Sequence, residues 1–318
     1  MGANNSEKFK TMIGGQALIE GIMMRGPKRD AIVIRGKDGI EVETSLRKER
    51  RKGSFQTWPF IRGVVNFFDS QVVGVKALMR SADLSAEIVE EKPSKLDMWL
   101  EKKLGDKKFQ NLIVSISVAL GMGMSILLFF LLPNIISSLF DKVIASNLLR
   151  NLIEGGVRLL IFMIYMLAVS RMKEMKRVFS YHGAEHKTIR CYEAGLPLNV
   201  ENVRAQTRKH PRCGTSFLFI VLTLSILVFS VASSLLLAVV PGLEAMRGTV
   251  VFTLVMLAFK LLLLPVVVSI SYEINRIVGR YDNVFTKVLT IPGMWFQNFT
   301  TYEPDDAMIE VGIAALQA

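Results

Sequence analysis

The chain has 318 residues, of which 51% are hydrophobic, and its formal net charge is +11 at pH 7. Its apolar residues are gathered into four long runs, which excludes an ordinary soluble protein of two domains. The runs cover residues 109–132, 152–170, 217–240 and 249–272. At ~1.5 Å of rise per helical residue, each can span a hydrocarbon core of ~30 Å. The sequence therefore predicts four transmembrane helices.

The basic residues predict which side of the membrane the ends of the chain face. Residues 1–11 are polar with no apolar core after them, so we expect no signal peptide. Most of the 39 Lys and Arg residues precede residue 109 or fall within 171–216. The positive-inside rule then predicts that both termini and the 171–216 loop are cytosolic. Anionic lipids beside these segments account for the positive charge, and no nucleic-acid partner is expected because no aromatic residues are interleaved with the basic ones.

The amino-terminal region predicts a small β structure and a helix. Residues 12–40 predict a Gly-rich loop followed by a hairpin, because 31–35 alternate in polarity before the turn Lys37-Asp38-Gly39. A basic cluster at 47–52 precedes 58–69, whose apolar residues recur at helical spacing. This helix could lie in the membrane interface or pack against the cytosolic region. Residues 85–108 alternate in charge and predict a solvated helix or linker.

The fold class that follows is a polytopic α-helical membrane protein with about four transmembrane helices and a mixed α+β cytosolic cap. We predict three regions along the chain. They are a cytosolic amino-terminal region (1–108), a membrane domain (109–272) with a cytosolic loop at 171–216, and a cytosolic carboxyl-terminal segment (273–318). A short helix is expected after Pro304, because acidic residues stand where a helix amino terminus favours them.

All three histidines and both cysteines lie between residues 182 and 213. His182 and His186 are four residues apart, so on a helix they would share one face and could bind the same metal ion. With Glu185 they form His-x-x-Glu-His, an inverted zinc-hydrolase pattern in which the carboxylate acts as general base on metal-bound water. Gly183 argues for a turn instead, because glycine inside a helix costs roughly 1 kcal/mol relative to alanine. The simpler alternative is a group of polar residues at the membrane surface.

A second block could complete the site. His210 and Cys213 precede the third predicted span, and Glu273 ends the fourth, so all three reach the same predicted surface. Any of them would complete the three-ligand plan of catalytic zinc sites. The expected cofactor is a divalent transition metal, with zinc as the first choice. Cys191 is predicted to pack as a small hydrophobic residue, and we expect no disulfide on the reducing side of a membrane.

Three ionisable residues fall inside or beside the predicted spans. Lys260 lies near the middle of the fourth span, which makes it a functional candidate, and the sequence shows no partner for it. Glu154 and Arg158 are four residues apart and are predicted to form a structural ion pair on one helix face.

Three blocks of the sequence together resemble the YqhQ-type family of bacterial membrane proteins, which is described as a predicted metal-dependent enzyme. They are GGQALIEGIMMRGP at 14–27, YHGAEHKT at 181–188 and HPRCGTSF at 210–217. The resemblance extends from Gly14 to the carboxyl terminus. It implies a location in the bacterial plasma (inner) membrane and favours the metal site, but it supplies no reaction.

The amino-terminal block is predicted to fold back over the histidine cluster. Gln16, Glu20, Arg25 and, beside the second block, Arg212 would then position an unknown substrate. The alternatives are that Gly and Met residues shape a tight turn and that Arg212 is a plain positive-inside charge.

Two functions remain open from the sequence. The first is a metal-dependent, hydrolytic enzyme with a cytosol-facing site. The second is a non-enzymatic membrane scaffold or regulator whose cluster holds a structural metal or none. An open water position would favour the first, and closed coordination by four protein ligands the second. A transport subunit using Lys260 ranks last, because the paired broken helices of transporters are lacking.

Overall fold

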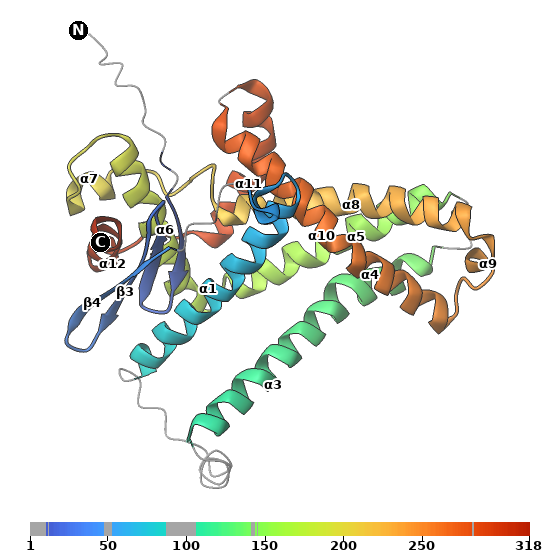
Figure 1. Ribbon diagram of the computed structural model, residues 1–318, viewed down its shortest axis with the longest axis horizontal. Coiled ribbons are helices and arrows are strands. Elements are labelled where there is room, and N and C mark those ends of the chain that lie inside the picture. The colour runs from blue at the N-terminus through green and yellow to red at the C-terminus, as the bar shows by residue number, and fades with distance from the viewer. Residues whose placement is uncertain are drawn as a thin grey trace. The chain divides into compact units, whose positions relative to one another are not determined.

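The computed structural model in Figure 1 describes residues 11, 13–47, 53–86, 106–140, 144, 146–281 and 283–318. This part of the chain is mostly helical and contains one small antiparallel sheet, which agrees with the helical and α+β parts of the predicted fold class. It divides into two compact units. The mixed unit comprises residues 1–89, 166–222 and 265–318, and the helical unit comprises residues 90–165 and 223–264. The basic cluster and the charged linker of the sequence analysis lie largely outside the described residues.

The sheet is a meander of four antiparallel strands in the order β1-β2-β3-β4. They are β1 (Gly14–Leu18), β2 (Gly21–Arg25), β3 (Arg29–Gly36) and β4 (Gly39–Leu46). The predicted turn joins β3 to β4, with Gly36 opposite Gly39. The predicted loop is corrected to a second hairpin, β1-β2, because the apolar residues of β2 alternate between two cores and so have the period of a strand.

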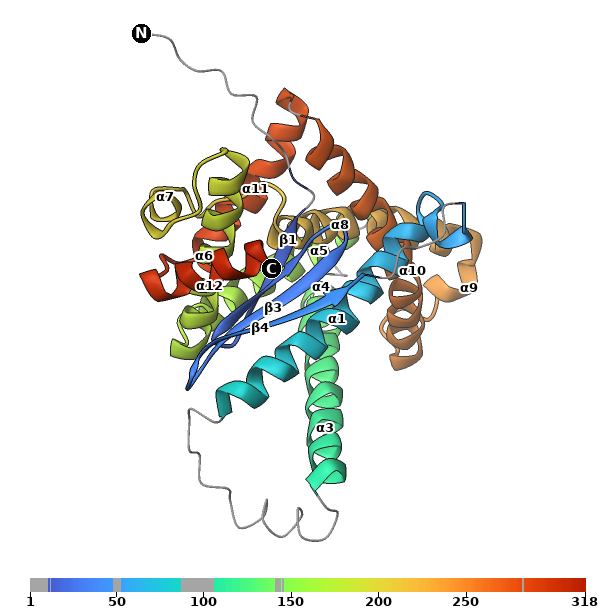
Figure 2. The same ribbon diagram turned by 60° about the vertical axis from the view of Figure 1, so that its left-hand side comes forward.

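Helices cover both faces of the sheet (Figure 2). The helical elements of the mixed unit include η1 (Phe55–Thr57), α1 (Ile61–Ala86), α6 (Lys173–Glu193), α7 (Val200–Arg204), α11 (Val284–Thr300) and α12 (Asp306–Gln317). One core joins the sheet to α6 and α12 through Ile22, Met24, Tyr181 and Val311. The opposite core joins it to α1 through Leu18, Met23 and Ala77. The side chains of one strand therefore anchor helices on both sides.

Helix α1 contains most of segment 58–69, which the sequence predicted to lie either in the membrane interface or against the cytosolic region. Its first turn packs against α10, where a Cβ on Gly63 would lie 2.9 Å from Cβ of Tyr272. A different set of its apolar side chains is exposed, at helical spacing: Ile61, Phe68, Val72, Val75 and Met79. The helix thus packs against the mixed unit and also presents an uncovered apolar stripe.

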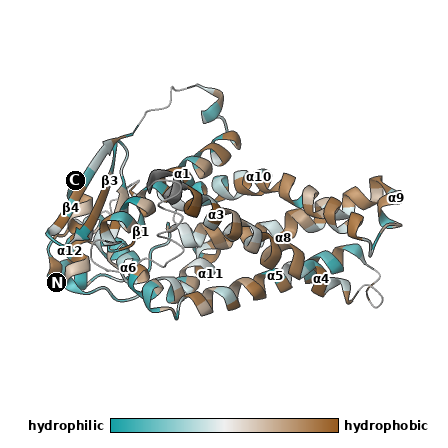
Figure 3. Ribbon diagram, turned by 90° about the horizontal axis from the view of Figure 1, so that it is seen from below, coloured by the Kyte–Doolittle hydropathy of each residue, from teal (hydrophilic) through white to brown (hydrophobic). Residues whose placement is uncertain are grey.

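Four helices are long and apolar enough to cross a membrane, as the sequence predicts. They cover Leu112–Ser138, Asn147–Val169, Gly214–Val239 and Val250–Arg280. The first is built from α3 (Asp106–Ile126), a π-helical turn η2 (Leu127–Leu131) and α4 (Leu132–Ser138). The others are α5 (Asn147–Val169), α8 (Gly214–Val239) and α10 (Val250–Arg280), with the short α9 (Pro241–Glu244) between α8 and α10. Figure 3 shows hydrophobic residues along these helices.

Two of these helices extend beyond their predicted carboxyl-terminal ends. The first continues past residue 132 to Ser138, although Pro133 lies at the start of α4. Proline lacks an N–H and clashes with the carbonyl four residues earlier, and the wider π-turn η2 accommodates that clash. The fourth continues to Arg280 with Pro265 inside it. Apolar composition therefore marks the spans but not the helix ends.

Candidate metal centre

Helix α6 carries His182, Glu185 and His186 in one buried stretch. The sequence left open whether this stretch is a turn, and the structure makes it helical through Gly183. A Cβ atom at Gly183 would collide with the main-chain oxygen of Tyr302. The glycine therefore permits the segment before α12 to cross closely over α6, and this close approach explains why the helix contains it.

Both α6 histidines are oriented by main-chain carbonyl groups. Nδ1 of His182 lies 2.7 Å from the oxygen of Thr300, and Nδ1 of His186 lies 2.5 Å from the oxygen of Arg208. A carbonyl oxygen can only accept, so each Nδ1 carries the hydrogen and donates it. Each Nε2 is then free to offer a lone pair, which is the arrangement usual for histidines that bind metals.

Cys213 joins these two histidines at the start of α8. Its Sγ lies 3.0 Å from Nε2 of His182, and the ligand atoms of His182, His186 and Cys213 all lie within 4.8 Å of one another. Burial raises the pKa of the Cys213 thiol, but the nearby His186 imidazole and the donors of Thr215 outweigh burial and lower it overall. A lowered pKa makes the thiolate, which is the form that binds metals, easier to form.

The ring of His186 has the properties expected of a metal ligand. Its Nε2 is buried and makes no hydrogen bond to any residue that the structure describes. Burial is the main cause that lowers the pKa of His186, so the neutral ring is favoured. Buried nitrogen atoms are nearly always satisfied, and a neutral imidazole is the form that binds a metal.

Glu185 lies beside this group without belonging to it. The carboxylate accepts a hydrogen bond from the Gly15 main-chain N–H, whereas its Oε2 has no partner among the described residues. Burial raises the pKa of Glu185 to about 7, with the His182 imidazole opposing this change and the Cys213 thiolate adding to it. A carboxyl group with a pKa near neutrality can both accept and return a proton.

His210 lies next to the three-ligand group, and the structure places it in a different network. Its ring centre is 5.6 Å from that of His186, and its Nε2 lies 3.7 Å from Oε2 of Glu193. The side chain of Gln297 on α11 clamps its main chain, accepting from the His210 N–H at 2.8 Å and donating to the His210 oxygen at 2.7 Å. Burial lowers the pKa of His210.

Two other sequence candidates lie in separate contacts. Glu273 on α10 binds Arg62 of α1, with Nε to Oε1 at 2.8 Å and Nη2 to Oε2 at 2.5 Å. Lys260 belongs to the helical unit, where its Nζ lies 2.5 Å from Oε1 of Glu154. The predicted Glu154–Arg158 pair is present, and the partner of Lys260 that was not evident in the sequence is this same Glu154.

The amino-terminal candidates make contacts within the mixed unit. Glu20 pairs with Arg177 and accepts from the Tyr181 hydroxyl at 3.1 Å. Arg25 donates to Asp30 of the neighbouring strand at 3.3 Å. The Gln16 carboxamide packs against Gly74 of α1. Arg212, the candidate from the second block, binds Glu193 and the Thr11 oxygen in the same unit.

Gly15 is the residue of the amino-terminal block, residues 14–27, that reaches the Glu185 side chain. Side chains alternate along β1, so Gly15 faces α6 while Gln16 faces α1. Sequence reasoning missed it, together with the orienting carbonyl groups and Gln297, because glycine and main-chain oxygen atoms carry no chemical pattern. The strand period of residues 14–18 was the available signal.

Comparisons with known proteins agree with the resemblance seen in the sequence. The model of the family described as "Protein of unknown function (DUF1385)" matches residues 58–318. The chain is similar to "Uncharacterized protein YqhQ" of Bacillus subtilis (strain 168), with 32% identity over 318 residues that cover 97% of this chain and 92% of the relative. No solved structure gives a significant match. Because the family model covers most of the chain, including α6 and the His210–Cys213 block, the protein belongs to the DUF1385 family.

Proposed function

We propose that this protein resides in the bacterial plasma membrane and binds a divalent transition metal for hydrolysis at a cytosol-facing site. The metal would be held by Nε2 of His182, Nε2 of His186 and Sγ of Cys213. One observation carries the proposal. Both Nδ1 atoms donate to main-chain carbonyl groups, so both Nε2 atoms keep a lone pair, and these two atoms lie close to the buried sulfur of Cys213. Four apolar helices support the membrane location.

The donor set suits zinc. Two imidazole nitrogens and one thiolate are ligands that Zn²⁺ prefers, and catalytic zinc sites use three protein ligands. The Nε2 atom of His186, which has no hydrogen-bond partner among the described residues, is a feature that a bound cation would account for. When bound, such a metal supplies Lewis-acid chemistry, polarising a carbonyl or phosphoryl oxygen and making water more acidic.

Glu185 is the proposed acid–base residue. Gly15 holds the carboxylate from one side, and Oε2 has no partner among the described residues, so this oxygen is available to take a proton. With a pKa of about 7, the group can accept a proton from attacking water and deliver it to a leaving group. Its position outside the three-ligand group favours this role over that of a ligand.

Burial favours a second candidate, a structural metal in a membrane scaffold. Glu185 is only 4% exposed and His186 only 1% exposed, and structural sites are closed. A small movement of the carboxylate would make Glu185 the fourth ligand and leave no open position. The basic residues before residue 109 and in the 171–216 loop, which support a cytosolic orientation and contact with anionic lipids, fit either candidate.

The test begins with metal content. The full chain is purified in detergent, and bound metals are measured by mass spectrometry before and after reconstitution with zinc, iron or manganese. We expect about one metal ion per chain, its loss in His182→Ala/His186→Ala, and its retention in the control His210→Ala. A wild-type protein that stays metal-free after reconstitution would refute the site.

X-ray absorption spectroscopy separates the two candidates. A Glu185→Gln variant of the hydrolytic site keeps its metal and an unchanged first coordination shell, because the carboxylate is not a ligand. A changed shell or weaker binding in Glu185→Gln would identify Glu185 as the fourth ligand and support the structural role. Glu185→Gln then serves as the inactive control in a screen of hydrolytic substrates.

A further inference from the structure

The helical unit contains a buried cluster with more positive than negative charge. Lys260 Nζ donates to both oxygens of Glu154, at 2.5 and 2.6 Å, and Arg158 Nη2 donates to Oε1 of the same carboxylate at 2.7 Å. All three side chains are nearly inaccessible, with exposed fractions of 4–5%. Two cations thus share one carboxylate. Buried charge is costly unless it is compensated, so this excess favours a further anion nearby.

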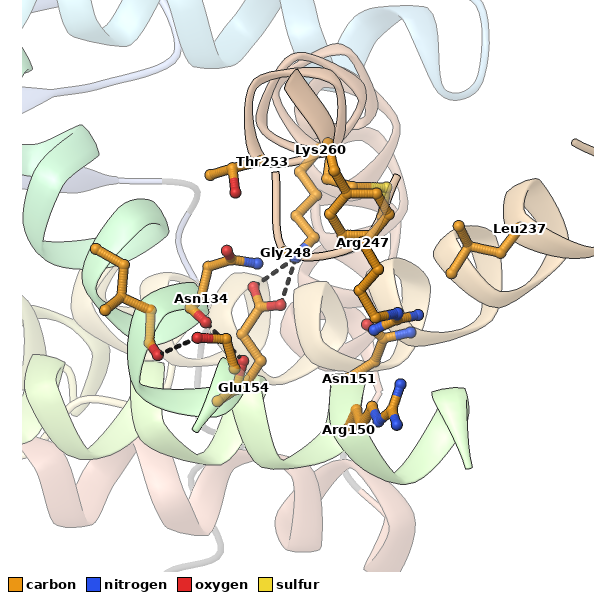
Figure 4. Close-up of a pocket in the computed structure, with 14 residues that line it drawn as sticks. Asn134, Arg150, Asn151, Glu154, Leu237, Arg247, Gly248, Thr253 and Lys260 are labelled. Atoms are coloured by element: carbon orange, nitrogen blue, oxygen red, sulfur yellow. Dashed lines mark hydrogen bonds and ion pairs between the residues drawn. The ribbon is translucent and has the colours of Figure 1, made fainter. Parts of the chain in front are cut away.

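A pocket of about 120 Å³ lies next to this cluster. Figure 4 shows Lys260 and Glu154 on one side of it and Arg150, Asn151 and Arg247 on another. Among the described residues, Glu154 is the only carboxylate that lines the pocket. Arg247 also binds Glu244, which is close by at 3.0 Å. Four basic side chains therefore lie in or behind the wall, those of Arg150, Arg158, Arg247 and Lys260, together with the carboxylates of Glu154 and Glu244.

Two helices begin at this pocket. Arg150 and Asn151 lie in the first turns of α5, which begins at Asn147, and Thr253 lies in the first turn of α10, which begins at Val250. The first turns of both helices thus contribute residues to the pocket wall, and the positive dipole end of a helix favours an anion. The helix ends add to the charge of the side chains and point to the same class of ligand.

The size and lining of the pocket restrict that ligand. Sites for drug-sized molecules measure about 300–1,000 Å³, so this pocket has room only for a small group. Its wall also carries neutral polar side chains: Asn134, Ser137, Ser138, Asn151 and Thr253. Arginine forks combined with hydroxyl and amide groups match the several oxygens of a phosphate group.

We infer that this pocket binds a phosphate-type anion, carried either by the headgroup of an anionic phospholipid or by free inorganic phosphate. Arg150 and Arg247 contact the anion, and the Glu154–Arg158–Lys260 cluster supplies the excess charge behind them. The pocket lies in the helical unit, whereas the candidate metal ligands lie in the mixed unit, so this proposal does not depend on the metal centre.

Two arms of one experiment distinguish the sources. In the first, inorganic phosphate is titrated into the full chain in detergent at constant ionic strength, and the midpoint of thermal unfolding is followed against chloride. In the second, the chain is placed in nanodiscs of phosphatidylcholine with or without phosphatidylglycerol. Stabilisation by phosphate identifies a soluble anion, and stabilisation by phosphatidylglycerol alone identifies a lipid headgroup.

Variants test the site itself. We expect Arg150→Gln to weaken binding by about tenfold, as for loss of one charged hydrogen bond. The matched control is Arg280→Gln, which changes an exposed arginine at the far end of α10 and should bind as the wild type does. If Arg150→Gln does not fold, Ser138→Asp replaces it, because Ser138 is an exposed pocket residue where a carboxylate would repel the anion. The proposal is wrong if neither anion stabilises the wild type, or if Ser138→Asp binds as tightly as the wild type.

Discussion

The main-chain N–H of Gly15 donates a hydrogen bond to the Glu185 carboxylate, and a Cβ atom at residue 15 would lie 2.7 Å from Cδ of Glu185. The first strand of the sheet therefore packs in close van der Waals contact with the helix that carries His182, Glu185 and His186. No larger residue fits at position 15 without displacing the carboxylate. This contact connects the amino-terminal block of the sequence with the His-x-x-Glu-His block.

Gly15→Ala should consequently destabilise the protein while leaving its metal in place. Overpacking of this kind costs about 1–3 kcal/mol, and Gly15 contacts none of the three ligands. Thermal unfolding in detergent and metal analysis would be measured together. Gly14→Ala is the matched control, because a Cβ there would meet nothing within 4 Å. Equal midpoints for the two variants would show that the Gly15 contact is not tight.

The two cysteines should differ in their effect on metal binding. Cys213→Ser replaces a proposed thiolate ligand, and we expect metal affinity to fall by at least about 100-fold, the upper range for loss of an outer-shell partner. Cys191→Ser should leave affinity unchanged, because Cys191 packs with Val203 and Ile309 in a separate core. Competition with a chromophoric chelator measures both affinities. Equal losses would show that Cys213 is no ligand.

Stability should depend on pH through Glu193. Burial raises the pKa of Glu193, but the nearby His210 ring and hydrogen bonds from Thr11 and Arg212 outweigh burial and lower it to about 2, from an ordinary 4.5. A lowered carboxyl pKa contributes stability that is complete above the ordinary value and is lost as the pH falls from there toward 2. The contribution at pH 7 is about 3 kcal/mol at most.

Glu193→Gln should therefore unfold at a lower temperature than the wild type at pH 7, with the difference shrinking as the pH falls below 4.5. Asp306→Asn is the control, because the Asp306–Arg204 pair is more than half exposed and such pairs contribute roughly 0–1 kcal/mol. Scanning fluorimetry across this pH range provides the measurement. A difference that stayed constant with pH would contradict the assignment.

Substitutions in the buried Glu154–Arg158–Lys260 cluster should differ in how much they lower the stability of the protein. Glu154→Gln leaves Arg158 and Lys260 as adjacent buried cations, and we expect a loss of about 3–5 kcal/mol. Lys260→Met leaves a neutral Glu154–Arg158 pair with a side chain of similar length, and we expect a loss below about 1.5 kcal/mol. Thermal unfolding in detergent compares the two. The explanation fails if Lys260→Met is the more damaging change.

The sequence by itself determined the features that depend on neighbours along the chain. Four apolar runs identified the four candidate spans, because bilayer thickness sets a helix length that can be counted in residues. The spacing of His182 and His186 likewise placed them on one helix face, because four residues make about one turn. The hairpin turn before Gly39 and the helix after Pro304 follow from equally local patterns.

Only the tertiary structure decided which distant residues meet. The sequence offered His210, Cys213 and Glu273 as equal candidates for the third ligand, and the packing brings Cys213 to His182 while His210 meets Glu193 and Glu273 meets Arg62. The partner of Lys260 and the role of Gly15 were decided in the same way. The physical reason is that these contacts depend on how helices and strands pack in register across long separations, and no local period or composition encodes that register.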